Sequence, residues 1–433
     1  MKVAFATLGC RVNMYESEAM AEKFIKNGYE VVEFDEMADV YVVNTCTVTN
    51  MSDKKSRQML SRAKRKNPDS IIAAVGCYTQ IAPEKVKEIG DVDVILGTRN
   101  KGDIVYWVNR AKEEGKTIVE VNDVLKNKKF EELNIEEYQD KTRAFLKIQD
   151  GCNNFCSYCL IPFARGAVCS KNPEIIIDEV KKLAAHGFKE IILSGIDISS
   201  YGVDLEGDWN LLTVLKKIDE IDGITRVRIG SIGPEFFNED RIEEIGNLKK
   251  LCPHFHLSLQ SGCNETLKRM NRKYTTEEFE NVVNLLRKYI KDISITTDII
   301  VGFPGETTEE FDKTYEYLKR IELSKMHIFK YSPRTGTRAE KMENQVDGNI
   351  KEERSKALIK LNEINEKKFI DRFIGEDMEV LYEQQCNNKE GYYEGYTPNY
   401  IKVISESKED LSGKIVNTKL IETKDEYAVG KII

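Results

Sequence analysis

Short apolar runs alternate with amphipathic segments over most of this chain, and no other feature constrains its fold as strongly. In the first part of the chain, three apolar runs match buried parallel strands, at residues 2–10, 40–46 and 71–77. The segments between and after them have helical periodicity, at residues 16–27, 54–66 and 83–89. The order of strand, helix and strand predicts an open, doubly wound α/β domain over residues 1–122.

The same alternation resumes at Arg143, after a charged and polar stretch at residues 123–142 that we interpret as a linker. Six apolar runs predict strands, at residues 145–149, 190–195, 226–231, 255–262, 293–303 and 327–332. Helical segments follow the pattern between them, near residues 174–186, 210–221, 237–247, 275–290 and 308–322. Six strand and helix repeats predict a partial (β/α)6 barrel over residues 143–370, smaller than the eight-fold barrel.

The pattern changes again near the end of the chain. A charged amphipathic helix is predicted at residues 349–372, and short alternating strands with turn signals follow it. Residues 371–433 therefore predict a small β-barrel, an architecture that often binds nucleic acid. Four tyrosines in this part are suited to stacking on bases or, equally, to packing in the barrel core: Tyr392, Tyr393, Tyr396 and Tyr400.

Cys152, Cys156 and Cys159 form a CxxxCxxC run just after the first strand of the predicted barrel. Three thiolates on a short loop provide three of the four cysteine ligands of a four-iron cluster and leave one iron open to a small molecule. The loop lies at the carboxyl-terminal mouth of the barrel, where active sites occur. Zinc is the main alternative, but it needs a fourth ligand, and no histidine follows within twenty-five residues.

Cys10, Cys46 and Cys77 each stand where one of the first three predicted strands ends. Ligands of open α/β sheets collect outside the carboxyl ends of the strands, so three cysteines far apart in sequence can converge there. This placement favours a second iron–sulfur cluster. The alternative is three separate buried thiols that pack as small hydrophobic groups.

Composition restricts the compartment and the mode of RNA binding. The start of the chain lacks a secretory signal and no apolar stretch reaches the roughly eighteen residues of a membrane span, so we expect a reducing cytoplasm. A net charge of −8 argues against RNA binding through bulk positive charge. The clearest local patch is residues 54–66, with seven basic residues and no acidic one, although a solvated helix face fits equally well.

Taken together, these motifs resemble a known family. CxxxCxxC with an aromatic residue before the last cysteine, here Tyr158, is the signature of radical S-adenosylmethionine (SAM) enzymes. The wider pattern resembles the methylthiotransferases, in LGCRVNMYESE, NTCTVTNMSDKKSRQ, VGCYTQ, GCNNFCSYCLIPFARG, ILSGIDISSYG, LQSGCNETLKRMNRKYT, DIIVGFPGET and FKYSPRTGTRAEKM. The end of the chain resembles their TRAM module, a β-barrel that contacts tRNA. The resemblance spans essentially the whole chain.

The resemblance implies two [4Fe-4S] clusters. The cluster on Cys152, Cys156 and Cys159 would bind SAM and generate a radical from it, and the one on Cys10, Cys46 and Cys77 would hold or deliver sulfur. SAM would thus serve both as radical source and as methyl donor. Carbon 2 of adenine has a strong C–H bond without acidity, so no side-chain base can remove its hydrogen and a cofactor must carry that step.

Six residues are expected around SAM. Gly195 leaves room for backbone to approach the methionine amino group, and Ser231 and Gln260 are suited to hydrogen bonds with the carboxylate and the ribose. Val301 would flank the adenine, with Tyr158 nearby through its backbone. Arg165 is suited to pair with the methionine carboxylate, or otherwise with a phosphate or a helix end.

Within the family, LGCRVN, NTCTVTN and TRAFLKIQDGCNNFC are closest to the branch that modifies N6-threonylcarbamoyladenosine at tRNA position 37. The isopentenyladenosine branch and the branch that modifies an aspartate of a ribosomal protein are the alternatives. The basic residues expected to contact tRNA are Lys54, Lys55, Arg57, Arg62, Arg269 and Arg272. We further expect an electron-donor protein, a sulfur donor, no membrane contact and a monomer.

Overall fold

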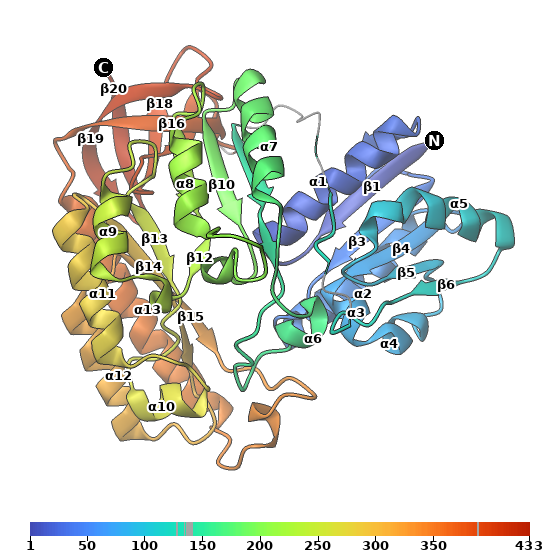
Figure 1. The fold of residues 1–433 in the computed structure, drawn as a ribbon, viewed down its shortest axis with the longest axis horizontal. Helices are drawn as coiled ribbons and strands as arrows, with labels where there is room; N and C mark the ends of the chain where they lie inside the picture. The colour runs from blue at the N-terminus through green and yellow to red at the C-terminus, as the bar shows by residue number, and fades with distance from the viewer. Residues whose placement is uncertain (127–128, 134, 136–141, 388) are drawn as a thin grey trace.

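The computed structural model describes residues 1–126, 129–133, 135, 142–387 and 389–433. An α/β region formed by the amino-terminal part of the chain lies on the right of Figure 1, and a second, larger α/β region lies on the left, with a β-barrel at its upper end. The predicted fold class is confirmed. None of the helices in these described ranges has both the length and the apolar character needed to cross a bilayer.

The amino-terminal region is built on a six-stranded parallel sheet. In sheet order its strands are β2 (Glu30–Val32), β1 (Lys2–Thr7), β3 (Val40–Thr45), β4 (Ile71–Gly76), β5 (Val94–Leu96) and β6 (Ile118–Glu120). Every residue of the central strand β3 is buried, as expected for an apolar run such as residues 40–43 when helices cover both faces.

Helices pack on both faces of this sheet, so it is doubly wound. One face is covered by α1 (Arg11–Lys26) and α5 (Ile104–Glu114), and the other by α2 (Asn50–Lys66) and α4 (Pro83–Lys87). The helix α2 begins four residues before the predicted range, because the side chain of Thr49 accepts a hydrogen bond from the Ser52 backbone N–H and caps it there.

The second region is a partial barrel of parallel strands. They are β7 (Arg143–Lys147), β10 (Glu190–Ser194), β11 (Arg226–Ile229), β12 (Ser231–Ile232), β13 (His254–Leu257), β14 (Ser294–Val301) and β15 (Lys325–Lys330). Gly230 separates β11 from β12, which together form the third of the six predicted strands, and a bridge between Val227 and Leu251 joins the two halves of the arc.

Amphipathic helices cover the outside of the arc. They are α7 (Pro173–Ala185), α8 (Leu211–Asp219), α9 (Glu239–Gly246), α11 (Thr276–Tyr289) and α12 (Thr308–Ile321). Capping boxes at Asn210, Thr275 and Thr307 define where three of them begin. Their apolar faces and the strands form the largest hydrophobic core of the molecule.

The long helix α13 (Gly348–Asp371) leads into the carboxyl-terminal barrel. Five strands close it in the order β16 (Asp377–Gln385), β17 (Tyr392–Tyr396), β18 (Lys402–Glu406), β20 (Tyr427–Ile432) and β19 (Ile415–Lys424). Tyr382 fills the barrel core, and its hydroxyl donates to Ser405 Oγ at 2.6 Å. Tyr396 and Tyr400 instead stack on one another outside that core, with ring centroids 4.8 Å apart.

The stretch interpreted as a linker packs more closely than its composition suggests. Leu133 and Ile135 are buried in the main core together with Tyr15 of α1, and the Glu131 carboxylate accepts a hydrogen bond from the Gly102 backbone N–H. These residues therefore help to join the two α/β regions. The rest of that prediction, at residues 127–128, 134 and 136–141, lies outside the described residues.

Candidate active site

The cysteine loop connects β8 (Gln149–Asp150) to the short helix α6 (Ile161–Arg165), and its three thiols, on Cys152, Cys156 and Cys159, are partly exposed. Hydrogen bonds within the chain fix its shape: the Cys159 backbone N–H donates to the Cys156 carbonyl at 3.0 Å, and that of Ser157 donates to the Met270 carbonyl at 3.0 Å. The loop is thereby attached to the barrel, and its three sulfurs are presented from one short segment.

Charged groups from the barrel surround this loop. Arg272 Nη1 donates to Cys156 Sγ at 3.3 Å, and an Asp197 carboxylate oxygen lies 3.6 Å from Cys152 Sγ. Burial raises the pKa of the Cys159 thiol to about 12, and burial together with Asp197 raises the pKa of Cys152. These free thiols hold their protons at neutral pH, so a bound metal must displace the protons in order to use the sulfurs as thiolate ligands.

The structure brings the upstream cysteines Cys10, Cys46 and Cys77 together, as their strand-end positions predicted. Their thiols lie close enough to affect one another electrostatically. Cys46 and Cys77 are buried, whereas Cys10 is exposed. Gly9, which precedes Cys10, has a φ of +103°, and a Cβ added there would come within 2.9 Å of Cys46 Sγ, so this turn needs glycine. Three thiols from three strand ends are a ligand set that fits an iron–sulfur cluster.

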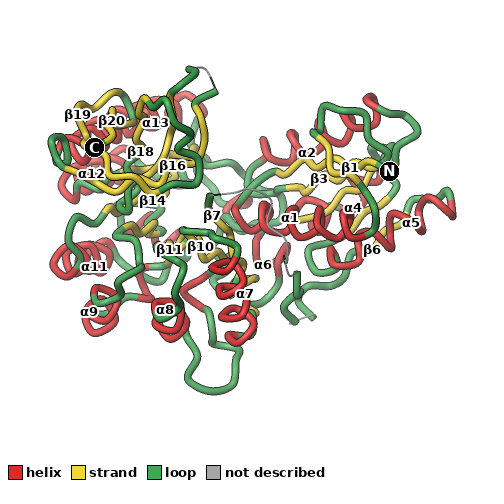
Figure 2. Tube along the Cα trace, turned by 90° about the horizontal axis from the view of Figure 1, so that it is seen from above, coloured by secondary structure: helices red, strands yellow, loops and turns green. Residues whose placement is uncertain are grey.

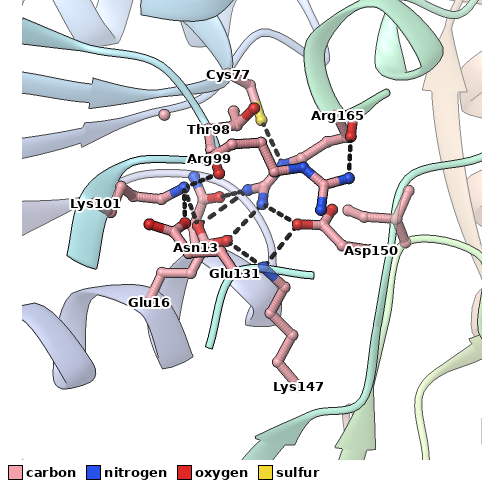
Figure 3. Close-up of polar contacts among 12 residues, drawn as sticks. Asn13, Glu16, Cys77, Thr98, Arg99, Lys101, Glu131, Lys147, Asp150 and Arg165 are labelled. Atoms are coloured by element: carbon pink, nitrogen blue, oxygen red, sulfur yellow. Dashed lines mark hydrogen bonds and ion pairs between the residues drawn. The ribbon is translucent and has the colours of Figure 1, made fainter. Parts of the chain in front are cut away.

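Arg165 contacts the upstream cysteine group from the second α/β region, and Figure 3 shows its hydrogen bond to Cys77. It belongs to the helix that follows the cysteine loop, yet its Nε donates to Cys77 Sγ at 3.2 Å. Its remaining N–H groups donate to Glu16, Asp150 and Asn13. All five donors are thus engaged in a fully buried site, and none remains for the methionine carboxylate that Arg165 was expected to bind.

The Arg165 site belongs to a larger buried ion network. Lys147 Nζ lies 2.8 Å from Glu16 and 2.6 Å from Asp150, and Lys101 Nζ lies 3.3 Å from Glu16. All five charged side chains have zero exposure. Burial alone would raise the pKa of Glu16, but the three cations around it lower that pKa to about 2.

This buried ion network lies between the two α/β regions. Glu16 is on α1 of the first region, whereas Lys147 and Asp150 are on β7 and β8 of the second, and Figure 2 shows α1 and β7 next to one another. Asp150 stands two residues before Cys152. The network thus fixes the upstream cysteines relative to the cysteine loop.

A cavity of about 830 Å³ opens where all three regions meet. Its walls are the turn after β1, the ends of β10 and β11, the inner faces of β13 to β15, and residues of α13 and the carboxyl-terminal barrel. Cys10 and two of the predicted SAM residues, Gly195 and Ser231, line it. A cavity of this size accommodates a nucleoside or a cofactor.

Three other residues predicted to bind SAM do not line this cavity. Tyr158 packs edge-on against Phe303 beside the cysteine loop. Val301 is buried at the end of β14. Gln260 has a φ of +74°, and its backbone bridges to β14, donating to the Asp298 carbonyl at 2.9 Å. Their roles toward SAM remain predictions.

The six predicted RNA contacts divide into two groups. Lys54, Lys55, Arg57 and Arg62 are exposed along α2. Arg269 is instead paired with Glu310, and Arg272 donates to Cys156. The guanidinium groups of Arg269 and Arg272 are therefore engaged within the barrel. Arg62 also pairs with a carboxylate, that of Asp35, but on the exposed face of α2. The RNA contacts remain predictions.

Sequence reasoning missed several polar residues that the structure places at these sites. His256, Asp298 and His327 project from β13, β14 and β15, with ligand atoms within 4.8 Å of one another, and they line the cavity. Glu16 and Asp150 lie inside quoted motifs, LGCRVNMYESE and QDGCNNFC, but no local pattern pairs one with the other.

Comparisons with known proteins decide the family. The Radical SAM superfamily profile matches residues 146–318, and the Uncharacterized protein family UPF0004 profile matches residues 2–97. The threonylcarbamoyladenosine tRNA methylthiotransferase MtaB of Bacillus subtilis (strain 168) is 43% identical over 100% of this chain and 96% of its own length. The chain belongs to the radical SAM tRNA methylthiotransferase family.

Further relatives of this methylthiotransferase carry two different names. The MtaB protein of Aquifex aeolicus is 41% identical over 96% of this chain and 99% of its own length. The tRNA-2-methylthio-N(6)-dimethylallyladenosine synthase of Clostridium tetani is 39% identical over 96% of this chain and 93% of its own length.

Among solved structures, the radical SAM methyltransferase TsrM of Kitasatospora setae matches the methylthiotransferase with a TM-score of 0.56 at 14% identity. The match covers 76% of this chain and 72% of TsrM. At that identity it supports the fold alone.

Proposed function

We propose that this methylthiotransferase converts N6-threonylcarbamoyladenosine at tRNA position 37 to its 2-methylthio derivative. The observation that carries the proposal is the cavity in which Cys10, the strand ends of the radical SAM barrel and the carboxyl-terminal barrel meet. One base presented there would lie beside Cys10 of the upstream group, and the strand end at Gly195 on the same wall continues to Asp197, which contacts Cys152 of the loop group. The choice of nucleoside follows the names of relatives that are 43% and 41% identical to this chain.

Two [4Fe-4S] clusters complete the proposed site. Cys152, Cys156 and Cys159 would hold one, and Cys10, Cys46 and Cys77 the other. When bound, they supply the electron that cleaves SAM and the sulfur that is transferred. The fit is supported by three thiols in each group and by hydrogen-bond donors that reach a sulfur of each group, from Arg272 and Arg165.

The residues of the chain itself bind and orient the ligands of the site and shield them from solvent. At Gly195, which lines the cavity, an added Cβ would lie 2.9 Å from the side-chain oxygen of Gln149, so glycine lets Gln149 pack closely against this strand end. Gln149 in turn accepts hydrogen bonds from the backbone N–H groups of Ile196 and Asp197, which holds the loop beside Cys152. These contacts prepare a rigid approach to the cysteine loop.

The carboxyl-terminal barrel would act as a TRAM module and hold the anticodon arm with the exposed basic face of α2. An electron-donor protein and a sulfur donor complete the cycle. We place the reaction in the cytoplasm, where thiols stay reduced and tRNA is available.

Anticodon stem-loops provide the test. The anaerobically reconstituted protein is incubated with SAM, sulfide, a reductant and a stem-loop carrying either threonylcarbamoyladenosine or isopentenyladenosine at position 37, and the nucleosides are measured by mass spectrometry. We expect the 2-methylthio product from the threonylcarbamoyl stem-loop. Product from the isopentenyl stem-loop alone would establish the alternative named by the Clostridium tetani relative and overturn the proposal.

A further inference from the structure

Most charged groups on the wall of the 830 Å³ cavity are already paired. Lys325 lies 2.7 Å from Glu366 and 3.3 Å from Glu426, and Lys402 lies 2.6 Å from Glu394. These lysines are neutralised by the protein itself, so they are poorly suited to bind a further anion.

The imidazoles on the wall do not provide a strong cation. Burial, reinforced by nearby arginines, holds the pKa of His254 well below its usual value, and burial also lowers the pKa of His327. Both are therefore neutral at pH 7. His256 faces Asp298, with Nε2 3.3 Å from the carboxylate.

Arg11 differs from all of these groups. Its guanidinium lines the same cavity, donates one hydrogen bond to the Tyr400 hydroxyl at 3.3 Å and lies over the Phe145 ring. Across the part of the chain that the structure describes, no carboxylate pairs with it. Four of its five N–H groups thus remain available for a ligand.

Helix stability does not explain an arginine at this position. Arg11 is the first residue of α1, where the helix dipole disfavours a positive charge. It also follows Cys10 directly, and both residues line the cavity. Tyr400, whose hydroxyl accepts the hydrogen bond from Arg11, is itself held in place. Its ring stacks on Tyr396, and the Arg228 guanidinium lies 4.4 Å from its ring centroid.

We propose that Arg11 binds the carboxylate of the threonyl group on the substrate adenine and thereby selects an anionic N6 substituent over an apolar one. This inference rests on the proposed function, because only the threonylcarbamoyl substituent carries a carboxylate. A guanidinium matches a carboxylate with two parallel hydrogen bonds, whereas an isopentenyl group offers it no acceptor. A site built around such a pair rejects a substrate that leaves the charge unpaired.

The test compares two stem-loops that differ only in the carboxylate. One carries threonylcarbamoyladenosine at position 37 and the other its carboxamide. For the unchanged protein we expect kcat/KM to favour the acid. In Arg11→Gln this preference falls by about 10- to 100-fold, the usual value of a charge-assisted pair. Arg11→Lys, which keeps the charge without the fork, retains an intermediate preference.

Controls separate selectivity from damage to the neighbouring cluster. Iron content and 5′-deoxyadenosine formation from SAM are measured in each variant, and both should match the unchanged protein. Arg320→Gln, which removes an arginine from the outer surface of α12, controls for net charge and should keep the full preference for the acid.

Other outcomes would overturn the inference in distinguishable ways. An acid preference that is unchanged in Arg11→Gln contradicts it directly. An equal loss of kcat/KM on the acid and the carboxamide stem-loops would assign Arg11 to a backbone phosphate. The same loss accompanied by a loss of 5′-deoxyadenosine formation would assign it to SAM. If the unchanged protein fails to modify the acid stem-loop at all, the proposed function fails first.

Discussion

The two cysteine groups present similar ligand sets but depend on different parts of the structure. Cys152, Cys156 and Cys159 come from one loop within eight residues, whereas Cys10, Cys46 and Cys77 follow the ends of three neighbouring strands that are far apart in sequence. The loop group depends on the conformation of one short loop, whereas the upstream group depends on correct strand pairing in the amino-terminal sheet.

Their surroundings differ in the same way. The loop group is partly exposed and touches single charged residues, Arg272 and Asp197. The upstream group rests on the fully buried Arg165, whose partners come from both α/β regions. Local geometry thus defines the loop group, whereas docking of the two regions defines the position of the upstream group. A mutation that affects one group should therefore leave the other largely intact.

Removing one ligand from each group should give the largest and clearest separation. We expect Cys152→Ala to abolish both 5′-deoxyadenosine formation and methylthiolated product, because SAM would bind at that cluster. Cys77→Ala should abolish the product while SAM cleavage continues. Each variant should lose about half of the roughly eight iron atoms that two clusters contain. Equal loss of SAM cleavage in both variants would contradict separate roles.

The buried ion network provides the next largest effect. Glu16→Gln removes the anion that faces Arg165, Lys147 and Lys101 and leaves buried cations without a full partner. We expect a loss of about 3–5 kcal/mol in unfolding free energy, measured by denaturant unfolding.

Measuring the release of iron during the same unfolding experiment distinguishes the two cysteine groups more clearly. The upstream iron should be released before the loop iron, because the network positions the upstream group. Glu239→Gln makes the same chemical change at an exposed pair with Lys288 and should leave both unfolding and iron release unaltered. Simultaneous release of all iron from Glu16→Gln would argue against this role of the network.

The loop group has one contact, between Arg272 and Cys156, that should affect the midpoint potential of its cluster. We expect this effect to be smaller than the two above. Arg272 donates to Cys156 Sγ, and a cation beside a cluster sulfur favours the reduced, more negative state. In Arg272→Met the midpoint potential of the loop cluster should fall by about 60 mV, a tenfold change for a one-electron couple. Potentiometry followed by electron paramagnetic resonance measures this. Arg269→Met, whose arginine pairs with Glu310, should leave the potential unchanged.

The sequence predicts the loop group and the strand-end positions well, for a physical reason. Periodicity of apolar residues reports which faces are buried, and parallel strands of one sheet end at one edge, so Cys10, Cys46 and Cys77 had to approach one another. The motif spacing alone places Cys152, Cys156 and Cys159 on one loop.

The contacts between regions were not predictable in the same way. Arg165 meets Glu16 across 149 positions of sequence, and Arg272 meets Cys156 across 116. The first pair depends on how the two α/β regions dock, and the second on how distant segments of the barrel pack together, and no local pattern encodes either. The same holds for Leu133 and Ile135, whose polar neighbours suggested a linker although both are buried in the core.

The basic face of α2 should give the smallest effect, because each exposed lysine adds only a screened contact. α2 begins shortly after Cys46, so RNA bound along it would approach the upstream group rather than the loop group. We expect Lys54→Gln with Lys55→Gln to weaken tRNA binding on every tRNA tested and to reduce the slope of log K against log salt by about 2, about 1 per phosphate contact.

A matched pair of lysines tests whether this effect is local. Lys216 and Lys217 are likewise adjacent and exposed, but on α8, on the outside of the barrel in Figure 1. Their double glutamine variant changes the net charge equally and should leave the salt dependence unchanged. Because the chain as a whole carries a net charge of −8, equal effects of the two variants would mean that overall charge, and not α2, governs RNA binding. RNA would then need no particular approach to the upstream group.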